Sequence, residues 1–528
     1  MDGKEYNMTD HGGEALARAV EAAYGRGKTD YSMEPLVRED GQGQPVGTIK
    51  PGDAVIFCCR RGEREIELTD MFIDPGFSAV DRKYIPDLDF SILTLYHEKY
   101  AGLPVAFAPE QVDTPLAQVI SSAGKTQLHC AESEKYAHVT FFLNGGRNEP
   151  FPGETDVRIP SPAGVPFDQV PHLSLERVAD AVIDGMDKHD FTVVNFANGD
   201  VIGHTASKEA KLEAAAFVSS QLQRVVETAL SQGLAVLITA DHGNIETLYT
   251  DRGEPHVAHT TNKVPLLVLD GRQPERKITP LDGALCDVAP TVLQALGLKQ
   301  PACMTGHTLT PDYDYGPDRR VLLVILDGWG FGKGDDGDAI HLADTPYWDA
   351  LLAGVPYSRL DASGTFVGLC AGKTGNSEAG HMNIGAGRVV PQDDMRLEAA
   401  VQNGTFAQNA VFRRQMAGVK ARGATLHLLS YLTHASSHGD IAYSLALARE
   451  AARQGLDPML HIIFDGRSTP PGSAPALLRE LEEQLAQIGA GRVADGVGRG
   501  LALDRAGNYD KVKCAYDAMT LGAGVRYR

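Results

Sequence analysis

The chain has 528 residues and a mass of 56.6 kDa, more than one hydrophobic core usually supports, so we expect at least two domains. Its hydrophobic content of 43% and charged content of 22% exclude a disordered, collagenous or coiled-coil chain. A formal net charge of -20 opposes binding to nucleic acid or to an anionic membrane, so an anionic substrate would need a local cluster of Arg and Lys.

Short apolar runs alternate with segments of helical period, which predicts α/β layers around a largely parallel sheet. The segment 208–232 has one broad apolar helical face, follows Ser207 as a candidate N-cap and stops at Gly233. It lies between two expected strands and completes a strand–helix–strand unit. In chain order, we expect buried strands at 54–57, 139–143, 192–195, 234–239, 264–269, 321–326 and 426–429.

Polar residues follow three of these strands directly. Asp200 comes after VVNFANG, Asp241 and His242 come after AVLITA, and Asp327 comes after VLLVIL. Because the carboxyl ends of parallel strands lie at one edge of a sheet, these segments can meet in one cleft. The segment 310–319 is polar, contains Pro and Gly, and is expected to be a linker.

The cysteines and the start of the chain bear on location. Seven cysteines are spread along the sequence without a CxxC pair, a pattern typical of reduced thiols. The first residues lack a basic stretch followed by an apolar one, and no window approaches about eighteen uninterrupted apolar residues. We therefore expect a cytoplasmic protein that binds neither membrane nor nucleic acid.

A set of carboxylate and imidazole side chains accompanies the strand ends. Such mixed ligands suit Mn²⁺ or Zn²⁺ better than Ca²⁺, and six of them suffice for two ions that clamp a phosphoryl group. The alternative is that DHG and GHT are ordinary turns and each histidine is a hydrogen-bonded loop residue. Four motifs in one chain favour the metal site. The candidate ligands are Asp200, His204, Asp241, His242, His259 and Asp327.

The segment KTGNSEAGHMNIGAGR offers a nucleophile. Ser377 precedes an expected helix start, where N-terminal amides and a nearby metal would favour an alkoxide or a phosphoester. The alternative is that Ser377 only caps this helix, the commoner role of a serine at such a position. The spacing does not decide between the two.

Several cationic side chains lie in short, Gly-rich contexts. Arg binds phosphate and carboxylate bidentately, and a small dianionic substrate would need several such groups in an acidic chain. For each arginine alone, a solvated surface position is the ordinary expectation. The candidates are Arg61, Arg64, Arg467, Arg499, Arg505 and Lys135.

These motifs together resemble a known family. LLVILDGWG, KTGNSEAGHMNIGAGR, ESEKYAHVTFFLNGG, FPGE, VNFANGDVIGHT, ITADHGNIE and AHTTNKVPL resemble the cofactor-independent (2,3-bisphosphoglycerate-independent) phosphoglycerate mutases of the alkaline-phosphatase superfamily. The resemblance covers nearly the whole chain. It implies an α/β fold with an alkaline-phosphatase-like domain, whose central sheet is flanked by helices, and a second α/β transferase domain.

The order of these segments differs from the family's. Family members begin with a strand like VLLVILDGWG and end shortly after a segment like MTGHTL, whereas here MTGHTLTP at 304–311 precedes that strand. A family segment resembling AYDAMTLGAGVRYR breaks off at Arg528 and resumes near Ala15. We therefore expect a circularly permuted chain. The expected domains are a metal-binding domain at 108–391 and a transferase-like domain split into 1–107 and 392–528.

The resemblance implies roles for individual residues. Ser377 matches the phosphoryl-accepting serine, and Lys135 matches a lysine at the phosphoryl-transfer centre. Two divalent ions are implied, Mn²⁺ first, with Mg²⁺, Co²⁺ or Zn²⁺ as alternatives. The matching ligands of one ion are Asp327, Ser377, Asp241 and His242, and those of the other are Asp200, His204 and His259. The positions that match substrate contacts are His438, Arg467, Arg499, Arg505, Arg61 and Arg64.

The implied reaction interconverts 3-phosphoglycerate and 2-phosphoglycerate through phosphorylated Ser377, with domain closure excluding water. The expected partner is thus a small anionic phosphorylated carboxylate, and a monomer is expected. One alternative is a paralogue that transfers a phosphoryl or phosphonyl-type group to or from a related phospho- or phosphono-carboxylate in phosphonate natural-product metabolism. A phosphatase is the second. A non-catalytic binding protein would lose metal ligands first, and here those motifs are intact.

The departures from the family pattern gather in the substrate-binding motifs. Where the family reads DGRD, this chain has Ser468 after Arg467, and the missing Asp is the residue expected to move a proton between two glycerate hydroxyls. GGVHSH becomes ASSHGD, which keeps His438 and puts Asp440 where a second histidine is expected. Asp440 and Asp504 are both candidates for the missing base.

Overall fold

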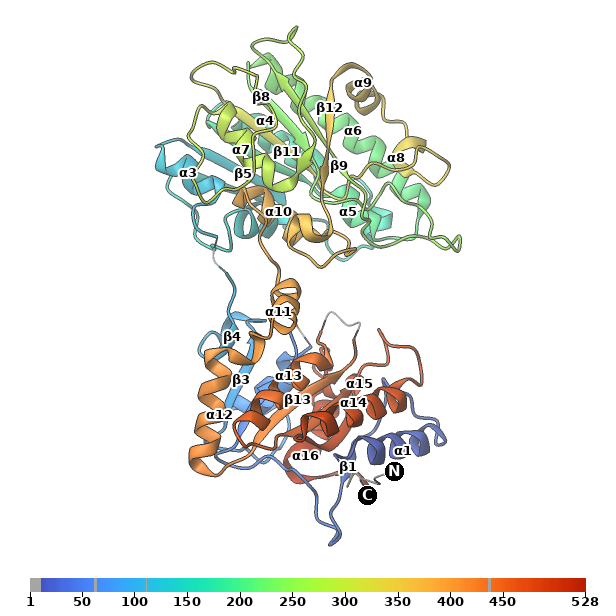
Figure 1. The fold of residues 1–528 in the computed structure, drawn as a ribbon. Coiled ribbons are helices and arrows are strands. Elements are labelled where there is room, and N and C mark those ends of the chain that lie inside the picture. The colour runs from blue at the N-terminus through green and yellow to red at the C-terminus, as the bar shows by residue number, and fades with distance from the viewer. Residues whose placement is uncertain (1–10, 61–63, 111, 435–437) are drawn as a thin grey trace, which may run out of the picture. The chain divides into compact units, whose positions relative to one another are not determined.

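The computed structural model describes residues 11–60, 64–110, 112–434 and 438–528. The chain divides into two compact units: unit 1 comprises Met1–Pro109 and Arg396–Arg528, and unit 2 comprises Glu110–Met395. Each unit is built on one eight-stranded sheet (Figure 1). No helix in the described part of the chain is long and apolar enough to cross a membrane.

The sheet of unit 1 is parallel apart from one antiparallel pair. In spatial order its strands are β16 (Val525–Tyr527), β1 (Leu36–Arg38), β15 (Arg492–Gly498), β14 (Met459–Phe464), β13 (Leu426–Leu432), β2 (Ala54–Phe57), β3 (Asp89–Thr94) and β4 (Val105–Phe107). Only β1 and β15 pair antiparallel among these described strands.

Helices cover both faces of this sheet. Alternate residues of a strand point to opposite faces, so each strand contributes side chains to two apolar cores. In β2, Ala54 and Ile56 pack in one apolar cluster, and Val55 and Phe57 pack in the other. The first cluster includes side chains of α1 (Gly13–Tyr24), α11 (Asp393–Gln402), α12 (Ala410–Arg422), α13 (Ile441–Arg453) and α14 (Ala474–Ile488). The second includes side chains of α2 (Ile66–Ile73), α15 (Arg499–Ala502) and α16 (Tyr509–Leu521).

The sheet of unit 2 has a parallel half that carries the candidate site. Its strands in spatial order are β10 (Gly283–Ala284), β12 (Tyr357–Asp361), β9 (Val264–Asp270), β8 (Ala235–Thr239), β11 (Val321–Leu326), β7 (Phe191–Phe196), β5 (Gln127–Glu132) and β6 (Glu154–Ile159). The run from β8 to β6 is parallel, whereas β9 pairs antiparallel with both of its neighbours.

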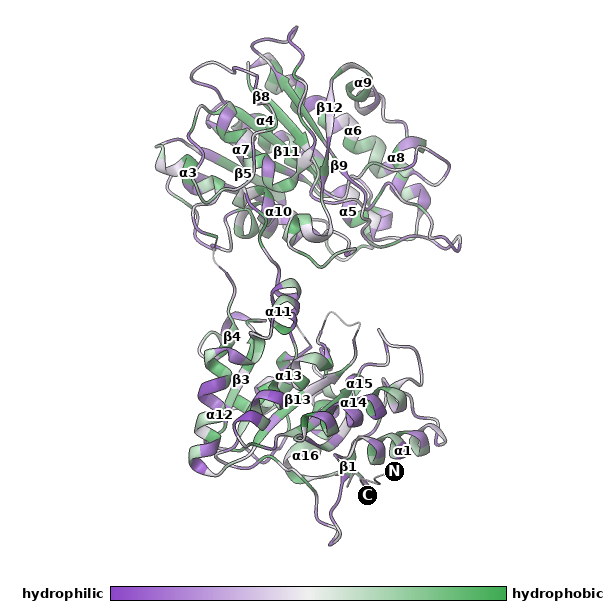
Figure 2. Cartoon of the chain, in the orientation of Figure 1, coloured by the Kyte–Doolittle hydropathy of each residue, from purple (hydrophilic) through white to green (hydrophobic). Residues whose placement is uncertain are grey.

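The helices of unit 2 fall into two groups, and contacts link the helices within each group. One group contains α4 (Leu175–Gly185), α5 (Asn198–Gly203), α6 (Lys208–Ser231), α8 (Ala339–Leu342) and α9 (Pro346–Gly354). The other contains α3 (Leu116–Ser122), α7 (Val288–Ala295) and α10 (Ser377–Ala386). The strands β8 and β11 are strongly hydrophobic (Figure 2) because helices cover both of their faces.

Local sequence signals explain several of these elements. Ser207 caps α6 by accepting a hydrogen bond from Ala210 N, and after the helix Gly233 takes a φ of 75°, which glycine adopts without strain. The predicted helix is therefore confirmed. The α/β class and six of the seven expected strands are also confirmed, with ends shifted by up to a few residues.

Two local expectations were wrong. The apolar run at 139–143 is a π-helical turn, His138–Phe142, because periodicity alone cannot separate a short buried strand from a helix. The segment 310–319 is not a solvated linker: Tyr313 and Tyr315 are buried, and Tyr313 donates a hydrogen bond to Asp270 at the end of β9. It packs within unit 2.

Candidate active site

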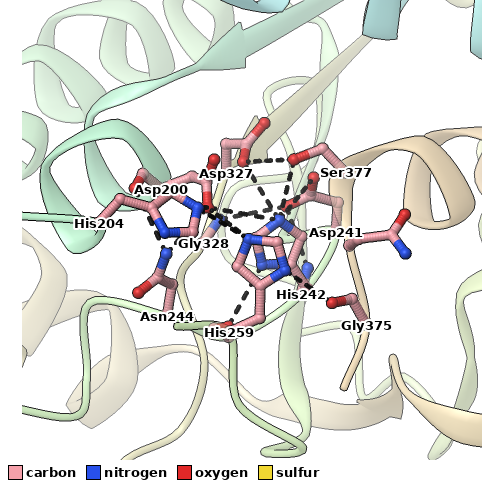
Figure 3. Close-up of polar contacts among 12 residues, drawn as sticks. Asp200, His204, Asp241, His242, Asn244, His259, Asp327, Gly328, Gly375 and Ser377 are labelled. Atoms are coloured by element: carbon pink, nitrogen blue, oxygen red, sulfur yellow. Dashed lines mark hydrogen bonds and ion pairs between the residues drawn. The ribbon is translucent and has the colours of Figure 1, made fainter. Parts of the chain in front are cut away.

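Three adjacent parallel strands of unit 2 end at one polar cluster (Figure 3). In β11, Ile325 pairs with Thr239 of β8 and Leu326 pairs with Phe196 of β7, so the three strands end nearly level. Asp327 directly follows β11, Asp241 lies just beyond β8, and Asp200 lies in α5 after β7. The expectation that these strand ends meet is confirmed.

Ser377 is the first residue of α10 and points into this cluster (Figure 3). The helix cap is its neighbour Asn376, whose side chain accepts a hydrogen bond from Ala379 N. Ser377 Oγ instead lies 2.9 Å from His242 Nε2 and 3.2 Å from Asp327 Oδ1. The interpretation of Ser377 as a simple N-cap is therefore wrong.

Lys135 follows β5 in a short 3₁₀ turn, Ser133–Lys135, and is buried. Its Nζ donates to Asp200 Oδ2 at 2.7 Å, to Asp327 Oδ1 at 2.8 Å and to Ser377 Oγ at 2.6 Å. Burial acts to lower the pKa of Lys135, but Asp327, Asp200 and Asp241 raise it above its ordinary value. The side chain is thus a fixed positive charge beside the serine oxygen.

The candidate metal ligands form two overlapping groups. Ligand atoms of Asp241, His242 and Asp327 lie within 4.8 Å of one another, and so do those of Asp200, His242 and His259. His204 Nε2 lies 3.2 Å from Asp200 Oδ1 and 3.0 Å from His259 Nε2. All six sequence candidates therefore occupy one site, with His242 between the two groups.

Hydrogen bonds from outside the cluster orient the imidazoles. Nδ1 of His204 is 2.9 Å from Val257 O, and Nδ1 of His259 is 2.8 Å from Gly375 O. Because a carbonyl can only accept, these contacts place a ring proton on Nδ1, so that Nε2 of the neutral ring is the atom able to bind a metal ion. Both Nε2 atoms face Asp200, as in a metal site.

The carboxylates of the cluster outnumber its ammonium group. Burial and neighbouring Asp241 raise the pKa of Asp327. Burial also acts to raise the pKa of Asp241, but His242 and His381 lower it below its ordinary value. Asp241 Oδ2 is buried beside imidazole nitrogens, with His381 Nδ1 at 3.2 Å and His242 Nε2 at 3.6 Å. An excess of buried carboxylates over ammonium groups, together with imidazole nitrogens, forms a donor set that fits divalent metal ions.

Sequence reasoning missed three residues that support the ligands. Asn195 Nδ2 donates to Asp327 Oδ2 at 2.6 Å, and Asn244 Nδ2 donates to Asp200 Oδ1 at 2.9 Å. His381 Nδ1 is 3.2 Å from Asp241 Oδ2. The sequence could have pointed to His381: it comes four residues after Ser377, and residues with this spacing lie on the same face of a helix.

The described candidates for substrate binding lie in unit 1, at the carboxyl ends of β2, β13, β14 and β15. Arg499 is buried, and its guanidinium donates to Asp465 Oδ1 at 2.6 Å. Arg64 donates to Leu503 O at 3.1 Å. Arg467 and Arg505 are exposed. His438 precedes α13 with 18% of its side chain exposed, and Arg61 lies outside the described residues.

Comparisons with known proteins point to one family. A model of the Metalloenzyme superfamily matches residues 47–300, and a model of the BPG-independent PGAM N-terminus matches residues 397–527. The 2,3-bisphosphoglycerate-independent phosphoglycerate mutase of Moorella thermoacetica is 44% identical over 301 residues, which cover 57% of this chain and 58% of the relative. The protein of that name from Akkermansia muciniphila is 44% identical over 295 residues, 56% of each chain.

The chain thus spans little more than half the length of the curated relatives it matches. A crystal structure of Leishmania mexicana phosphoglycerate mutase at low cobalt concentration aligns with 51% of this chain and 52% of its own, at 26% identity and a TM-score of 0.40. The relatives' names lend no support to the phosphono-carboxylate or phosphatase alternatives. The chain thus has a two-domain α/β arrangement, matches the Metalloenzyme superfamily and the BPG-independent PGAM N-terminus in separate segments, and is similar to 2,3-bisphosphoglycerate-independent phosphoglycerate mutases.

Proposed function

We propose that the protein interconverts 3-phosphoglycerate and 2-phosphoglycerate through a phosphoserine at Ser377. The observation that carries the proposal is the setting of Ser377 Oγ, which lies within 3.2 Å of Lys135 Nζ, His242 Nε2 and Asp327 Oδ1. A hydroxyl held among a fixed cation, an imidazole and carboxylates at a helix start is suited to nucleophilic attack on phosphorus.

The proposed cofactors are two divalent ions, with Mn²⁺ as the first choice. One would be held by Asp327, Ser377, Asp241 and His242, and the other by Asp200, His204 and His259. When bound, such ions lower the pKa of the serine hydroxyl and neutralise the phosphoryl oxygens.

The protein's own groups account for the rest of the transfer step. Lys135 supplies a charge that opposes the build-up of negative charge on Ser377 Oγ and on the phosphoryl group. Ser377 is the first residue of α10, and the N-terminus of a helix favours a phosphoester at that position. As the bond from phosphorus to Ser377 Oγ forms, the bond from phosphorus to the glycerate oxygen breaks. A reversal on the other glycerate hydroxyl completes the exchange.

For unit 1 we propose the role of holding the anionic glycerate. The supporting features are the cationic residues at the carboxyl edge of its sheet, namely Arg64, Arg467, Arg499 and Arg505, and the nearby His438. Arg61, the remaining candidate, lies outside the described residues. In a chain of net charge -20, an anion needs such a local cluster. The transferase-like role of 1–107 with 392–528, and the metal-binding role of 108–391, are part of this proposal.

We also propose that the chain is circularly permuted relative to its family. In support, the model named for an N-terminus matches residues 397–527, downstream of the Metalloenzyme match at 47–300. The cytoplasmic location and the monomeric state stay predictions.

The test is a ³¹P NMR time course of the Mn²⁺-loaded protein with 3-phosphoglycerate alone. Growth of a 2-phosphoglycerate resonance is the expected result. Release of inorganic phosphate would indicate a phosphatase, and no change would mean that the substrate differs. Mn²⁺ without protein is the control.

A further inference from the structure

Glu65 is a buried carboxylate that the chemistry described so far leaves without a role. It lies at the N-cap position of α2, and its side chain is 0% exposed. Neither carboxylate oxygen accepts a hydrogen bond from a described residue. His438 is its ion-pair neighbour, with Nδ1 3.4 Å from Glu65 Oε1. Because burying a carboxylate without donors is unfavourable, this position calls for a partner that can supply a proton.

The backbone holds the two side chains together. Arg60 N donates to His438 O at 2.8 Å, which ties the loop after β2 to the loop before α13. The His438 ring also packs edge-on against Tyr431, with ring centroids 6.4 Å apart. The imidazole is 18% exposed whereas Glu65 behind it is sealed, so a substrate can reach the histidine and not the carboxylate.

Other carboxylates at this edge of the sheet are already held by donors. Asp465 accepts hydrogen bonds from a tyrosine hydroxyl, an arginine and a backbone N–H, and Asp504 accepts from two backbone N–H groups. Burial acts to raise the pKa of both, but these donors lower it below the ordinary value. Asp440 caps α13 through Ala442 N. Asp465 and Asp504 are therefore weak bases, and the Asp440 carboxylate is engaged as a helix cap.

The surroundings of Glu65 favour proton exchange with His438. Burial raises the pKa of Glu65, while His438 and Arg499 oppose that rise. The other titratable groups that act on it are Cys59 and Tyr96, and burial raises the pKa of each, so both stay neutral. A carboxyl group with a raised pKa is closer in basicity to an imidazole, which makes proton sharing efficient.

We infer, on the basis of the proposed function, that Glu65 is a positioning residue for proton transfer in unit 1. Its carboxylate faces Nδ1 of His438 at 3.4 Å and orients the ring by this ion-pair contact, so that Nε2 carries the proton between the two hydroxyls of the glycerate. Ser468 has no ionisable group for this task, and Glu65 with His438 takes the place of the absent Asp.

The proton balance closes over one cycle. When the phosphoryl group moves to Ser377, the bond from phosphorus to O3 breaks, the bond to Oγ forms, and O3 takes a proton from His438 Nε2. When the group returns, O2 gives its proton to Nε2 as the bond from phosphorus to O2 forms. The imidazole ends as it began, and Ser377 Oγ attacks as the alkoxide and is released as the alkoxide, so no other proton changes place.

The test compares kcat and KM of the Mn²⁺-loaded full chain across pH for wild type, Glu65→Gln and Glu67→Gln. We expect Glu65→Gln to lower kcat about 100-fold or more, with KM within about threefold, and to change the pH profile. Glu67→Gln is the matched control: it is a buried carboxylate on the same helix, and glutamine keeps the oxygen that accepts from Gly507 N. The control should match wild type.

A second variant separates a proton-transfer role from a structural one. Adding Ser468→Asp to Glu65→Gln should restore kcat at least about tenfold, because it returns an ionisable carboxyl group to the edge of the site. An unchanged kcat and pH profile in Glu65→Gln would overturn the inference while the proposed function stands. A raised KM with an unchanged kcat, or a melting temperature well below that of wild type without rescue, would also overturn it. A wild type that makes no 2-phosphoglycerate refutes the proposed function itself, and the inference with it.

Discussion

Replacing Lys135 with Met tests how the charge cluster of unit 2 is balanced. The ammonium lies 2.7 Å from Asp200 Oδ2 and 2.8 Å from Asp327 Oδ1, and all three side chains are buried. At an effective dielectric constant of about 20, each contact is worth about 6 kcal/mol of gross attraction. Desolvation offsets most of it, and removing one partner of a buried ion pair costs about 3–5 kcal/mol net, because the remaining charge is left uncompensated.

The assay is thermal unfolding of the metal-free protein in EDTA, followed by calorimetry. For a unit of this size, a loss of about 3–5 kcal/mol lowers its melting temperature by roughly 10 °C. Adding Mn²⁺ should narrow the gap between variant and wild type, since bound cations replace the missing charge and stabilise the folded state by mass action.

Lys211→Met is the matched control. Lys211 is also buried in unit 2, but its Nζ donates to the backbone oxygen of His256 at 2.6 Å rather than to a carboxylate. Its loss should cost about 1.5–3 kcal/mol, the value of one charged hydrogen bond. Equal stability of the Lys135→Met and wild-type proteins in EDTA would refute the charge argument, and so would an equal cost for the two lysines.

Three further predictions concern the nucleophile, the metal and acid stability. Ser377→Ala should abolish transfer without loss of folding, checked by ³¹P NMR and circular dichroism, and substantial residual turnover would remove Ser377 as nucleophile. Chelation should stop turnover and Mn²⁺ should restore it, whereas activity indifferent to EDTA would contradict the two-metal proposal. Burial lowers the pKa of His427 to about 4, below its value of about 6.5 in the unfolded chain. The unfolded chain therefore takes up a proton first as the pH falls. The free energy of unfolding is unaffected above about pH 6.5 and decreases by about 3 kcal/mol toward pH 4. Urea denaturation across that range should show a smaller loss in His427→Gln, and an equal loss would contradict the assignment.

Much of unit 2 follows from local sequence patterns. The helix after Ser207, the apolar strands and the polar residues just beyond them are set by periodicity and capping, which act over a few residues. Asp200, Asp241 and Asp327 were therefore predictable as strand-end residues of one edge. The same reasoning gave a wrong prediction for 139–143, because a short apolar stretch is equally suited to a buried strand and to a helical turn.

The partners of these residues were settled by tertiary structure. The position of β11 between β7 and β8 depends on long-range strand order. Together with the placement of β5 and α10, it brings Asp327 to Lys135 and Ser377. Whether Ser377 caps its helix or enters the cluster also depended on Asn376 taking the cap. The pairing of Glu65 with His438 carries no local signal, since the two residues are far apart in sequence and meet only because β2 and β13 are neighbours in the sheet of unit 1.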